Sequence, residues 1–463
     1  MKNNNNCLAS KQASVFQLTA SSCYLLVFAL LLSACSRQDL PEAAATATTA
    51  EMAKGGNGHV SNATVMAWND VSEKMYYSVG APPPVLSRTF AMIQVAMHDA
   101  LNGIKPKFET YAYKGATDKD ADPDAAVSQA AYRMLVALQY PGQSIAPAET
   151  QYAVSMAAIS NGDGKTKGIA LGNAVADALL AKRNPDLPSI VVLGHPSTPA
   201  NGTMPGEYRY LPPLGYALGG FDQQQTWVIQ SSTQFRPATI YGKTNVTEAV
   251  ATPHYATDYE ELRQYGRQGV SLRTPDQSEI GVFWAENSSK GWNAVSREVI
   301  KSRPANSMDA WKTARLLALT QIAVADAYIA VFDGKIFFNF WRPVSAVQLG
   351  DADGNPQTVG EPAWEPVLGT PAVGEFPSAH AMSGAAAGQV LRRYFDKDQF
   401  DMVLTSEFLP GVVRKYSSIN AAIHDNSLSR IYIGFHFRHA VEVGEAAGYQ
   451  LGDYVFEHGL PEN

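Results

Sequence analysis

Helical periodicity is the feature that most restricts the fold of this chain of 463 residues. From about residue 61, apolar side chains recur at spacings of three and four, which is typical of helices with one buried face. Residues 306–335 carry two neighbouring apolar stripes, which predict a helix that is buried on most sides. No segment shows convincing strand alternation, and no repeat of 20–50 residues is found. The sequence therefore predicts an all-α fold.

The composition restricts the classes of function. A content of 46% hydrophobic and 17% charged residues indicates a compact globular protein. The net charge of −7 gives no basic surface for nucleic acid. The three cysteines, Cys7, Cys23 and Cys35, all precede the predicted helical part. That part therefore has no thiol to hold haem, an iron–sulfur cluster or a cysteine-rich zinc site, or to act as a nucleophile.

The N-terminus has the pattern of an export signal. An apolar run over residues 23–35 is too short to span a membrane comfortably and ends in Leu-Ser-Ala-Cys, which resembles a bacterial lipobox. This pattern predicts a signal peptide over residues 1–34, a lipid on Cys35 and a polar, flexible tether over residues 35–60. The chain would then be exported and held at a membrane by the lipid alone, facing the periplasm or the cell surface. The alternative is an ordinary secretory signal with a coincidental cysteine.

The remaining chain divides into three parts. Residues 61–184 predict an N-terminal helical half, and residues 266–463 predict a C-terminal helical half. Between them, residues 185–265 are rich in Pro, Gly and aromatics without a sustained period, which predicts a long irregular insertion. His98 and Asp99 lie on a predicted helix, where a polar cluster between packed helices is favoured over a catalytic role. The side chains of the insertion that are candidates to reach a site are His195, Tyr208, Arg209, Trp227 and Arg236.

Two segments of the C-terminal half carry unusual polar residues. Lys335 and Arg342 are seven residues apart, which predicts two cations on one face of a helix with no acid between them. Ser378 follows Pro377 and predicts a helix N-cap, with His380 in the first turn. The amides of that turn have no partner within the helix and suit a bound anion. Taken alone, the first segment is also compatible with two surface cations, and the second with an ordinary capped helix that carries an incidental histidine.

A third segment places Arg430 six residues before His436. Gly434 lies between them and predicts a break between two helices, which would let both side chains converge on one point. His439 lies one turn beyond His436, but a pair of histidines without a third ligand is weak evidence for zinc.

Together the segments spell Lys-x6-Arg-Pro, Pro-Ser-x-His and Ser-Arg-x5-His. This pattern resembles the signature shared by vanadium-dependent haloperoxidases and the type 2 phosphatidic acid phosphatases and related acid phosphatases. Residues 91–104 and 205–213 are also similar to blocks of the bacterial haloperoxidase-like branch. The resemblance covers most of residues 61–458 and implies a helical bundle of the vanadium haloperoxidase and acid phosphatase type.

The resemblance implies a site for a tetrahedral oxyanion, which is vanadate in the haloperoxidases. Lys335, Arg342 and Arg430 would neutralise its equatorial oxygens, and Ser378 and the amide of Ala379 would donate hydrogen bonds to them. Three cations and backbone amides suit a trianion, because charge-assisted hydrogen bonds replace those of water.

Two histidines complete the implied site. His436 would bond vanadium axially, and His380 would be the acid–base group on the opposite side. The position four beyond the axial histidine, commonly Asp in the family, is Ala440 here. In the phosphatases that Asp orients the nucleophilic histidine, so its absence favours vanadate. Glu442 and Glu445 are candidate substitutes for it.

Three functions are compatible with these residues. The favoured one is a vanadate-dependent haloperoxidase that oxidises halide with hydrogen peroxide to hypohalous acid, which halogenates a small organic acceptor. Phe332 and Val373 lie where side chains would tune the choice of halide. The first alternative is an acid phosphatase of the phosphomonoesterase or phosphatidic acid type, which needs no metal and forms a phosphohistidine at His436. The second is a noncatalytic phosphate-binding lipoprotein, which would have no need of His380.

Overall fold

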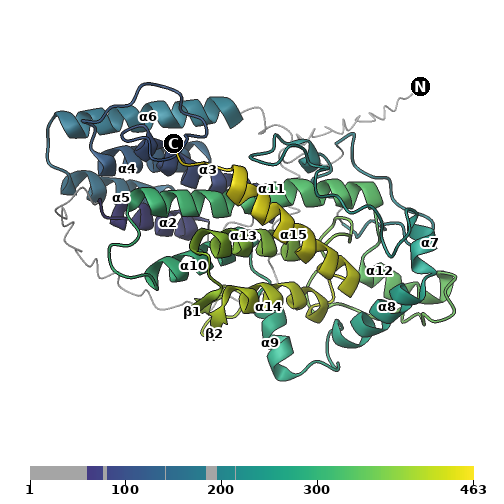
Figure 1. Ribbon diagram of the computed structural model, residues 1–463. Helices are drawn as coiled ribbons and strands as arrows, with labels where there is room; N and C mark the ends of the chain where they lie inside the picture. The colour runs from purple at the N-terminus through teal and green to yellow at the C-terminus, as the bar shows by residue number, and fades with distance from the viewer. Residues whose placement is uncertain (1–59, 77–80, 141, 184–194, 214) are drawn as a thin grey trace, which may run out of the picture. The chain divides into compact units, whose positions relative to one another are not determined.

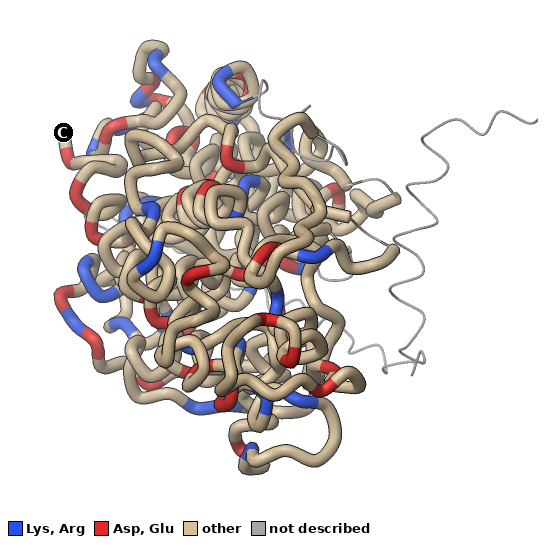
Figure 2. The backbone as a smooth tube through the Cα atoms, turned by 90° about the vertical axis from the view of Figure 1, so that its right-hand side faces the viewer, with Lys and Arg blue, Asp and Glu red and all other residues tan. Residues whose placement is uncertain are grey.

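A computed structural model describes residues 60–76, 81–140, 142–183, 195–213 and 215–463 (Figure 1). The predicted signal peptide, Cys35 and nearly all of the predicted tether lie outside the described residues, as do residues 185–194 of the predicted insertion. The described part is mostly helical, as the periodicity predicts. In the view of Figure 2, Lys and Arg are interspersed with Asp and Glu along the described part of the chain.

The N-terminal half contributes five helices to the described part of the chain. They are α2 (Ala63–Met75), α3 (Pro83–Asn102), α4 (Pro123–Ala137), α5 (Ala146–Ala158) and α6 (Asp163–Arg183). Pro at the first or second position opens α3, α4 and α5, where its missing N–H costs no hydrogen bond. Asp122 caps α4 by accepting the N–H of Ala125. Helix α3 is buried along almost its whole length and packs against α11 and α4.

The predicted insertion holds more regular structure than its composition suggests. After a short 3₁₀ turn, η2 (Phe221–Gln223), it contains α7 (Val246–Val250) and α8 (Pro253–Tyr265). The prediction that residues 185–265 are irregular throughout is therefore wrong for its last twenty residues. Thr252 caps α8 and Pro253 opens it, but the helix is largely polar, so its apolar period is weak.

The C-terminal half supplies the remaining elements. They are α9 (Pro275–Phe283), α10 (Ser288–Lys301), α11 (Ala310–Phe338), α12 (Pro343–Gln348), η3 (Gly350–Ala352), α13 (Ala379–Phe395), β1 (Gln399–Thr405), β2 (Val413–Ser418), α14 (Ile419–Tyr432) and α15 (Arg438–His458). The antiparallel pair β1–β2 corrects the prediction that the chain has no strand. The alternation is present in β1, where Phe400, Met402 and Leu404 face inward, but an exposed Val403 obscures it.

Helix α11 is the centre of the bundle and packs against α3 and α13 (Figure 1). It is long and apolar enough to cross a membrane by length and composition, yet its most apolar window is entirely buried by neighbouring helices. This burial agrees with the two apolar stripes of the sequence and identifies α11 as a core helix.

Small residues bring α13 and α15 into close contact. A Cβ added to Gly448 of α15 would lie 2.4 Å from the Met382 carbonyl oxygen of α13, and one added to Gly452 would lie 2.6 Å from that of Ala386. Such distances leave room only for glycine. The glycines of α15, together with the small side chains of Ala381 and Ala385 that face them, therefore allow the two helices to approach closely.

Candidate active site

The two cations of the first motif lie on either side of a helix end. Lys335 is in the last turn of α11, which ends where Asn339 adopts a left-handed conformation with φ of 45°. Arg342 is the N-cap residue of the next helix, α12. The prediction that both project from one face of one helix is therefore wrong. Both side chains are nevertheless buried and line the same cavity.

Main-chain carbonyl oxygens hold these two cations in place. The Lys335 Nζ donates to the carbonyls of Gly374 and Glu375, each at 2.8 Å. The Arg342 Nε donates to the carbonyl of Val373 at 2.7 Å. Burial, reinforced by the charge of Arg342, lowers the pKa of Lys335 well below its ordinary value. A bound anion would oppose this shift.

Arg430, in the last turn of α14, supplies the third buried cation. Its Nη2 donates to the carbonyl of Trp284 at 2.7 Å, and its Nε donates to the Ser429 hydroxyl at 3.0 Å. Burial lowers the pKa of Arg430 to about 9.

In the described part of the chain, no carboxylate forms an ion pair within 4.0 Å of the three cations. Glu375 acts on Lys335 and Arg342 from nearby. Glu286 also lines the cavity, and burial raises its pKa well above its ordinary value, which favours its neutral form. The cavity thus has an excess of positive charge.

The head of α13 completes this side of the cavity. Ser378 is its N-cap, and its Oγ accepts the N–H of Ala381 at 3.4 Å. Ala379 and His380 line the cavity, whereas Ser378 is fully buried just behind them. The predicted cap and the first-turn histidine are therefore found where the sequence places them.

These residues share a cavity of about 240 Å³. Its polar lining includes Lys335, Arg342, His380, Arg430 and His436, and its apolar lining includes Leu218, Phe332, Val373 and Phe435. Phe332 and Val373, which the sequence singled out for tuning the halide, do face the cavity. The structure thus brings together six of the seven predicted oxyanion-site residues as lining, with Ser378 directly adjacent.

His436 has a carboxylate partner that the sequence analysis missed. Its Nδ1 lies 2.9 Å from Glu375 Oε1, which also accepts the N–H of Phe437 at 3.0 Å. The expectation drawn from Ala440, that His436 lacks a supporting carboxylate, is therefore wrong. Glu442 does not fill this role, because its side chain is 60% exposed and lies beside Arg438. The sequence did contain a signal for this partner, because Glu375 is an acid only two residues before Pro377, where the second motif begins.

The neighbours of His436 determine where its proton lies. Arg342 Nη1 approaches its Nε2 at 3.2 Å, and an arginine only donates, so Nε2 must present a lone pair. The proton then sits on Nδ1 and is donated to Glu375. Burial, together with Arg342 and Lys335, lowers the pKa of His436 well below its ordinary value and keeps the ring neutral. Burial raises the pKa of Glu375 to about 8, against the opposing effect of Lys335 and Arg342.

His380, unlike His436, faces a hydroxyl rather than a carboxylate at its Nδ1. Its Nε2 is buried and makes no hydrogen bond of good geometry among the described residues, while its Nδ1 lies 3.3 Å from the Ser288 hydroxyl. Burial, with the charge of Arg430, lowers the pKa of His380 well below its ordinary value. The Trp284 main chain also lies close to the ring and partly opposes this lowering of the pKa. A ring nitrogen without a well-formed hydrogen bond, three cations in excess and a neutral histidine lone pair fit a tetrahedral oxyanion that takes a nitrogen as a further ligand.

The other candidate residues lie elsewhere. The side chains of His195, Tyr208, Arg209, Trp227 and Arg236 do not line the cavity, to which the insertion contributes Ala217 and Leu218 instead. His439 stacks on Phe376 and accepts the N–H of Tyr241 at 3.0 Å, so its ring is structural. Within the described ranges no three or more His, Cys, Asp or Glu side chains are grouped to hold a metal ion.

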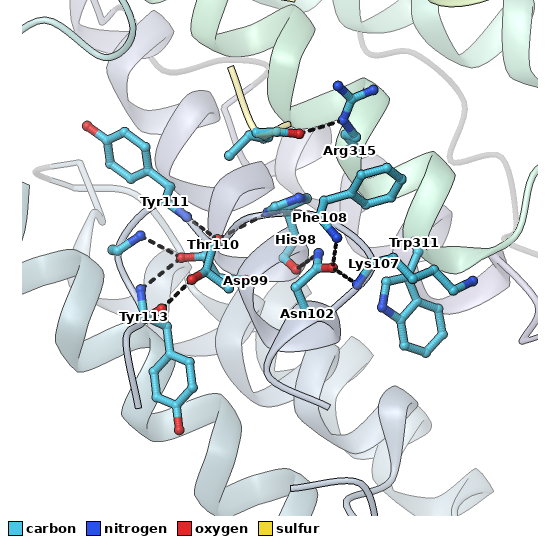
Figure 3. Close-up of polar contacts among 12 residues, drawn as sticks. His98, Asp99, Asn102, Lys107, Phe108, Thr110, Tyr111, Tyr113, Trp311 and Arg315 are labelled. Carbon is cyan, nitrogen blue, oxygen red and sulfur yellow. Dashed lines mark hydrogen bonds and ion pairs between the residues drawn. The ribbon is translucent and has the colours of Figure 1, made fainter. Parts of the chain in front are cut away.

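His98 and Asp99 of α3 form a separate polar cluster, as the sequence favoured. Asp99 accepts the N–H groups of Tyr111, Ala112 and Tyr113 at 2.8–3.0 Å, and its Oδ1 contacts His98 Nδ1 at 3.1 Å (Figure 3). The acid therefore anchors the loop that follows α3.

Comparisons with known proteins find similar chains. A family model described as the second helical-bundle domain of vanadium chloroperoxidase (VCPO) matches residues 315–460, which include all seven predicted oxyanion-site residues. The vanadium chloroperoxidase of Curvularia inaequalis is 26% identical over 493 aligned residues, covering 81% of this chain and 78% of its own length. Residues 315–460 therefore match a domain of the vanadium chloroperoxidases, and most of the chain is similar to one such enzyme.

Solved structures show a similar fold. A bacterial vanadium-dependent iodoperoxidase superposes with a TM-score of 0.71 at 22% identity, covering 87% of this chain and 97% of its own. A bacterial vanadium-dependent chloroperoxidase in its holo form superposes with a TM-score of 0.64 at 15% identity, covering 85% and 97%. The predicted helical bundle is thereby confirmed.

Proposed function

We propose that this chain is a vanadate-dependent haloperoxidase that oxidises halide with hydrogen peroxide to hypohalous acid, which then halogenates a small organic acceptor. The observation that carries the proposal is the convergence of three buried cations and the Nε2 lone pair of His436 on one cavity. Curated and solved relatives named as vanadium haloperoxidases support it. Bound vanadium would supply a Lewis-acidic centre that activates hydrogen peroxide.

The residues of the chain divide the work by their chemistry. Lys335, Arg342 and Arg430 hold the oxygens of the oxyanion by charge. His436 offers a neutral nitrogen as ligand, because Glu375 holds its proton at Nδ1. His380 moves a proton at its ring nitrogen beside the bound group. The apolar walls formed by Phe332 and Phe435 limit the access of water.

An acid phosphatase is the second candidate, and Glu375 is the observation that favours it. A carboxylate on Nδ1 of His436 is the support that a nucleophilic histidine needs, so Ala440 no longer argues against a phosphohistidine intermediate. In that reaction His380 would protonate the leaving group. The preference for the haloperoxidase over the acid phosphatase rests on the relatives that are named as vanadium haloperoxidases.

Assays of the purified protein with and without vanadate distinguish the candidates. We expect oxidation of iodide or bromide by hydrogen peroxide only after vanadate loading, and inhibition of this reaction by phosphate. His380→Ala should lower turnover by about 10²–10⁴-fold while vanadate binding is largely retained. Hydrolysis of a phosphomonoester by the metal-free protein, without halide oxidation after loading, would establish the phosphatase. Phosphate binding with neither activity would establish the binding lipoprotein.

We further propose that the chain is anchored to a membrane by a lipid on Cys35. The lipobox-like residues 32–35 and the polar segment that follows support this proposal. Cys35→Ala should release the protein from the membrane fraction or block its processing. Normal processing with membrane association intact in that variant would contradict the anchor.

A further inference from the structure

His380, the proposed acid–base group, is held by a hydroxyl cluster that lies outside the three motifs. We propose that Ser288 is a positioning residue that fixes the His380 ring with its proton on Nε2, so that His380 acts as a hydrogen-bond donor towards the bound oxyanion or substrate. Only the catalytic consequence rests on the proposed function. The position of the proton is a property of the protein without vanadate.

Three helices bring the cluster together. Ser288 is the first residue of α10, and the side chain of the cap residue Asn287 accepts the N–H of Ser289 at 2.9 Å and fixes that helix start. Tyr328 comes from α11, and Ser383 lies one turn after His380 in α13. The three hydroxyl-bearing residues are at most 3% exposed, so no bulk water competes for their hydrogen bonds.

The hydrogen bonds of Ser288 determine the tautomer of His380. The Ser383 hydroxyl has one hydrogen and two acceptors within reach, which are the Ser288 Oγ at 2.9 Å and the main-chain carbonyl of His380 at 3.3 Å. The shorter contact assigns this hydrogen to Ser288. The Ser288 Oγ also accepts from the Tyr328 hydroxyl at 3.2 Å. A serine hydroxyl has two lone pairs and one hydrogen, so both lone pairs are then used. Its hydrogen is left for His380 Nδ1 at 3.3 Å. Nδ1 is therefore an acceptor, and the neutral ring carries its proton on Nε2.

The two histidines of the cavity are thereby held in opposite tautomers. Glu375 accepts a hydrogen bond from the Nδ1–H of His436. The His436 Nε2 therefore carries a lone pair, which suits a ligand to vanadium. Ser288 donates to Nδ1 of His380 and leaves a proton on its Nε2, which makes no hydrogen bond of good geometry in the described part of the chain. The carboxylate of Glu375 thus gives His436 the tautomer of a metal ligand, and the hydroxyl of Ser288 gives His380 the tautomer of a hydrogen-bond donor.

The direct test is nitrogen NMR of protein labelled with ¹⁵N-histidine, without vanadate and near neutral pH. We expect a protonated Nε2 and an unprotonated Nδ1 for His380, assigned by the signals that disappear in His380→Gln. Ser288→Ala should give a mixture of tautomers, and Ser288→Thr should restore the single one. Ser289→Ala is the matched control, because the neighbouring Ser289 hydroxyl is buried but has no hydrogen-bond partner among the residues that the structure describes.

Turnover supplies the second measurement. In the vanadate-loaded enzyme, Ser288→Ala should lower kcat by about 10–100-fold with vanadate affinity unchanged, as expected for loss of a group that orients a catalytic histidine. Ser289→Ala should keep wild-type turnover. A protonated Nδ1 in wild type, or an unchanged tautomer in Ser288→Ala, would overturn the proposal. If wild type shows no halide oxidation, the proposed function fails, and the NMR result alone decides the role of Ser288.

Discussion

Two buried polar regions of this molecule contain a histidine, and they differ in how their charge is balanced. In the first, the carboxylate of Asp99 beside His98 is met by three backbone N–H groups of the following loop (Figure 3). In the second, three buried cations share a cavity with Glu286, whose pKa burial raises well above its ordinary value. The nearby Glu375 is engaged by His436 and the N–H of Phe437. The first region is balanced within the chain, and the second is not.

The comparison teaches that unbalanced charge at a cavity, more than a buried histidine, marks a ligand site. Nε2 of His98 is as buried and as unpartnered as Nε2 of His380, but His98 lines none of the cavities described for this structure. The Asp99 arrangement recurs at Asp326 of α11, which accepts the N–H groups of Trp227, Val228 and Ile229. Buried acids on core helices serve here as anchors for loops.

Removal of His436 should have the largest effect on the unbalanced region. We expect His436→Ala to abolish the retention of vanadium, because it removes the nitrogen ligand from the cation cluster. Vanadium retained after gel filtration, measured by mass spectrometry of the metal, provides the readout. His254→Ala is the control, since its side chain is 55% exposed and outside the cavity. Equal retention in the two variants would show that His436 is not a ligand.

A smaller effect is expected when the partner of His436 is changed. Glu375→Gln keeps the size of the side chain but removes the carboxylate that holds the proton on Nδ1. Vanadate affinity should fall by about 10–100-fold, the usual range for a group that orients a metal ligand. Equilibrium titration with vanadate measures this change, with the exposed Glu442→Gln as control. Wild-type affinity in Glu375→Gln would separate Glu375 from the site.

No effect on vanadate is expected from the balanced region. Asp99→Ala leaves three backbone N–H groups without their acceptor, so the free energy of unfolding should fall by about 3 kcal/mol or more. Denaturant unfolding measures this loss, and Asp177→Ala, at a 62% exposed carboxylate, should lose less than about 1 kcal/mol. Vanadate affinity per folded molecule should stay at the wild-type value. A loss of affinity in folded Asp99→Ala would assign the first region a functional role.

The sequence predicts the elements of the site better than their connections. His380 and the cap Ser378 are local features, since a Ser after Pro at a helix start constrains its own first turn. The pairing of Glu375 with His436 spans 61 positions and depends on how the segment before α13 meets the start of α15. The contact of Ser288 with His380 spans 92 positions.

The placement of Arg342 shows a different limit. Its seven-residue spacing from Lys335 suggests a common helical face, but α11 ends between them at the left-handed Asn339. Such an end depends on tertiary contacts that the periodicity of the apolar residues does not encode. The two cations still converge because carbonyl oxygens of residues 373–375 bind both side chains. The motif therefore predicted which cations share the cavity, although the helical geometry assumed for them was wrong.

Three buried cations are proposed to form one oxyanion site. Calorimetric titration of the metal-free protein with vanadate tests this proposal most directly. We expect vanadate to bind at one saturable site per chain and to be displaced by phosphate. Arg430→Ala should weaken this binding by at least about 30-fold, the loss expected when one member of a buried charged set is removed. The absence of saturable binding in wild type, or full affinity in Arg430→Ala, would contradict the account.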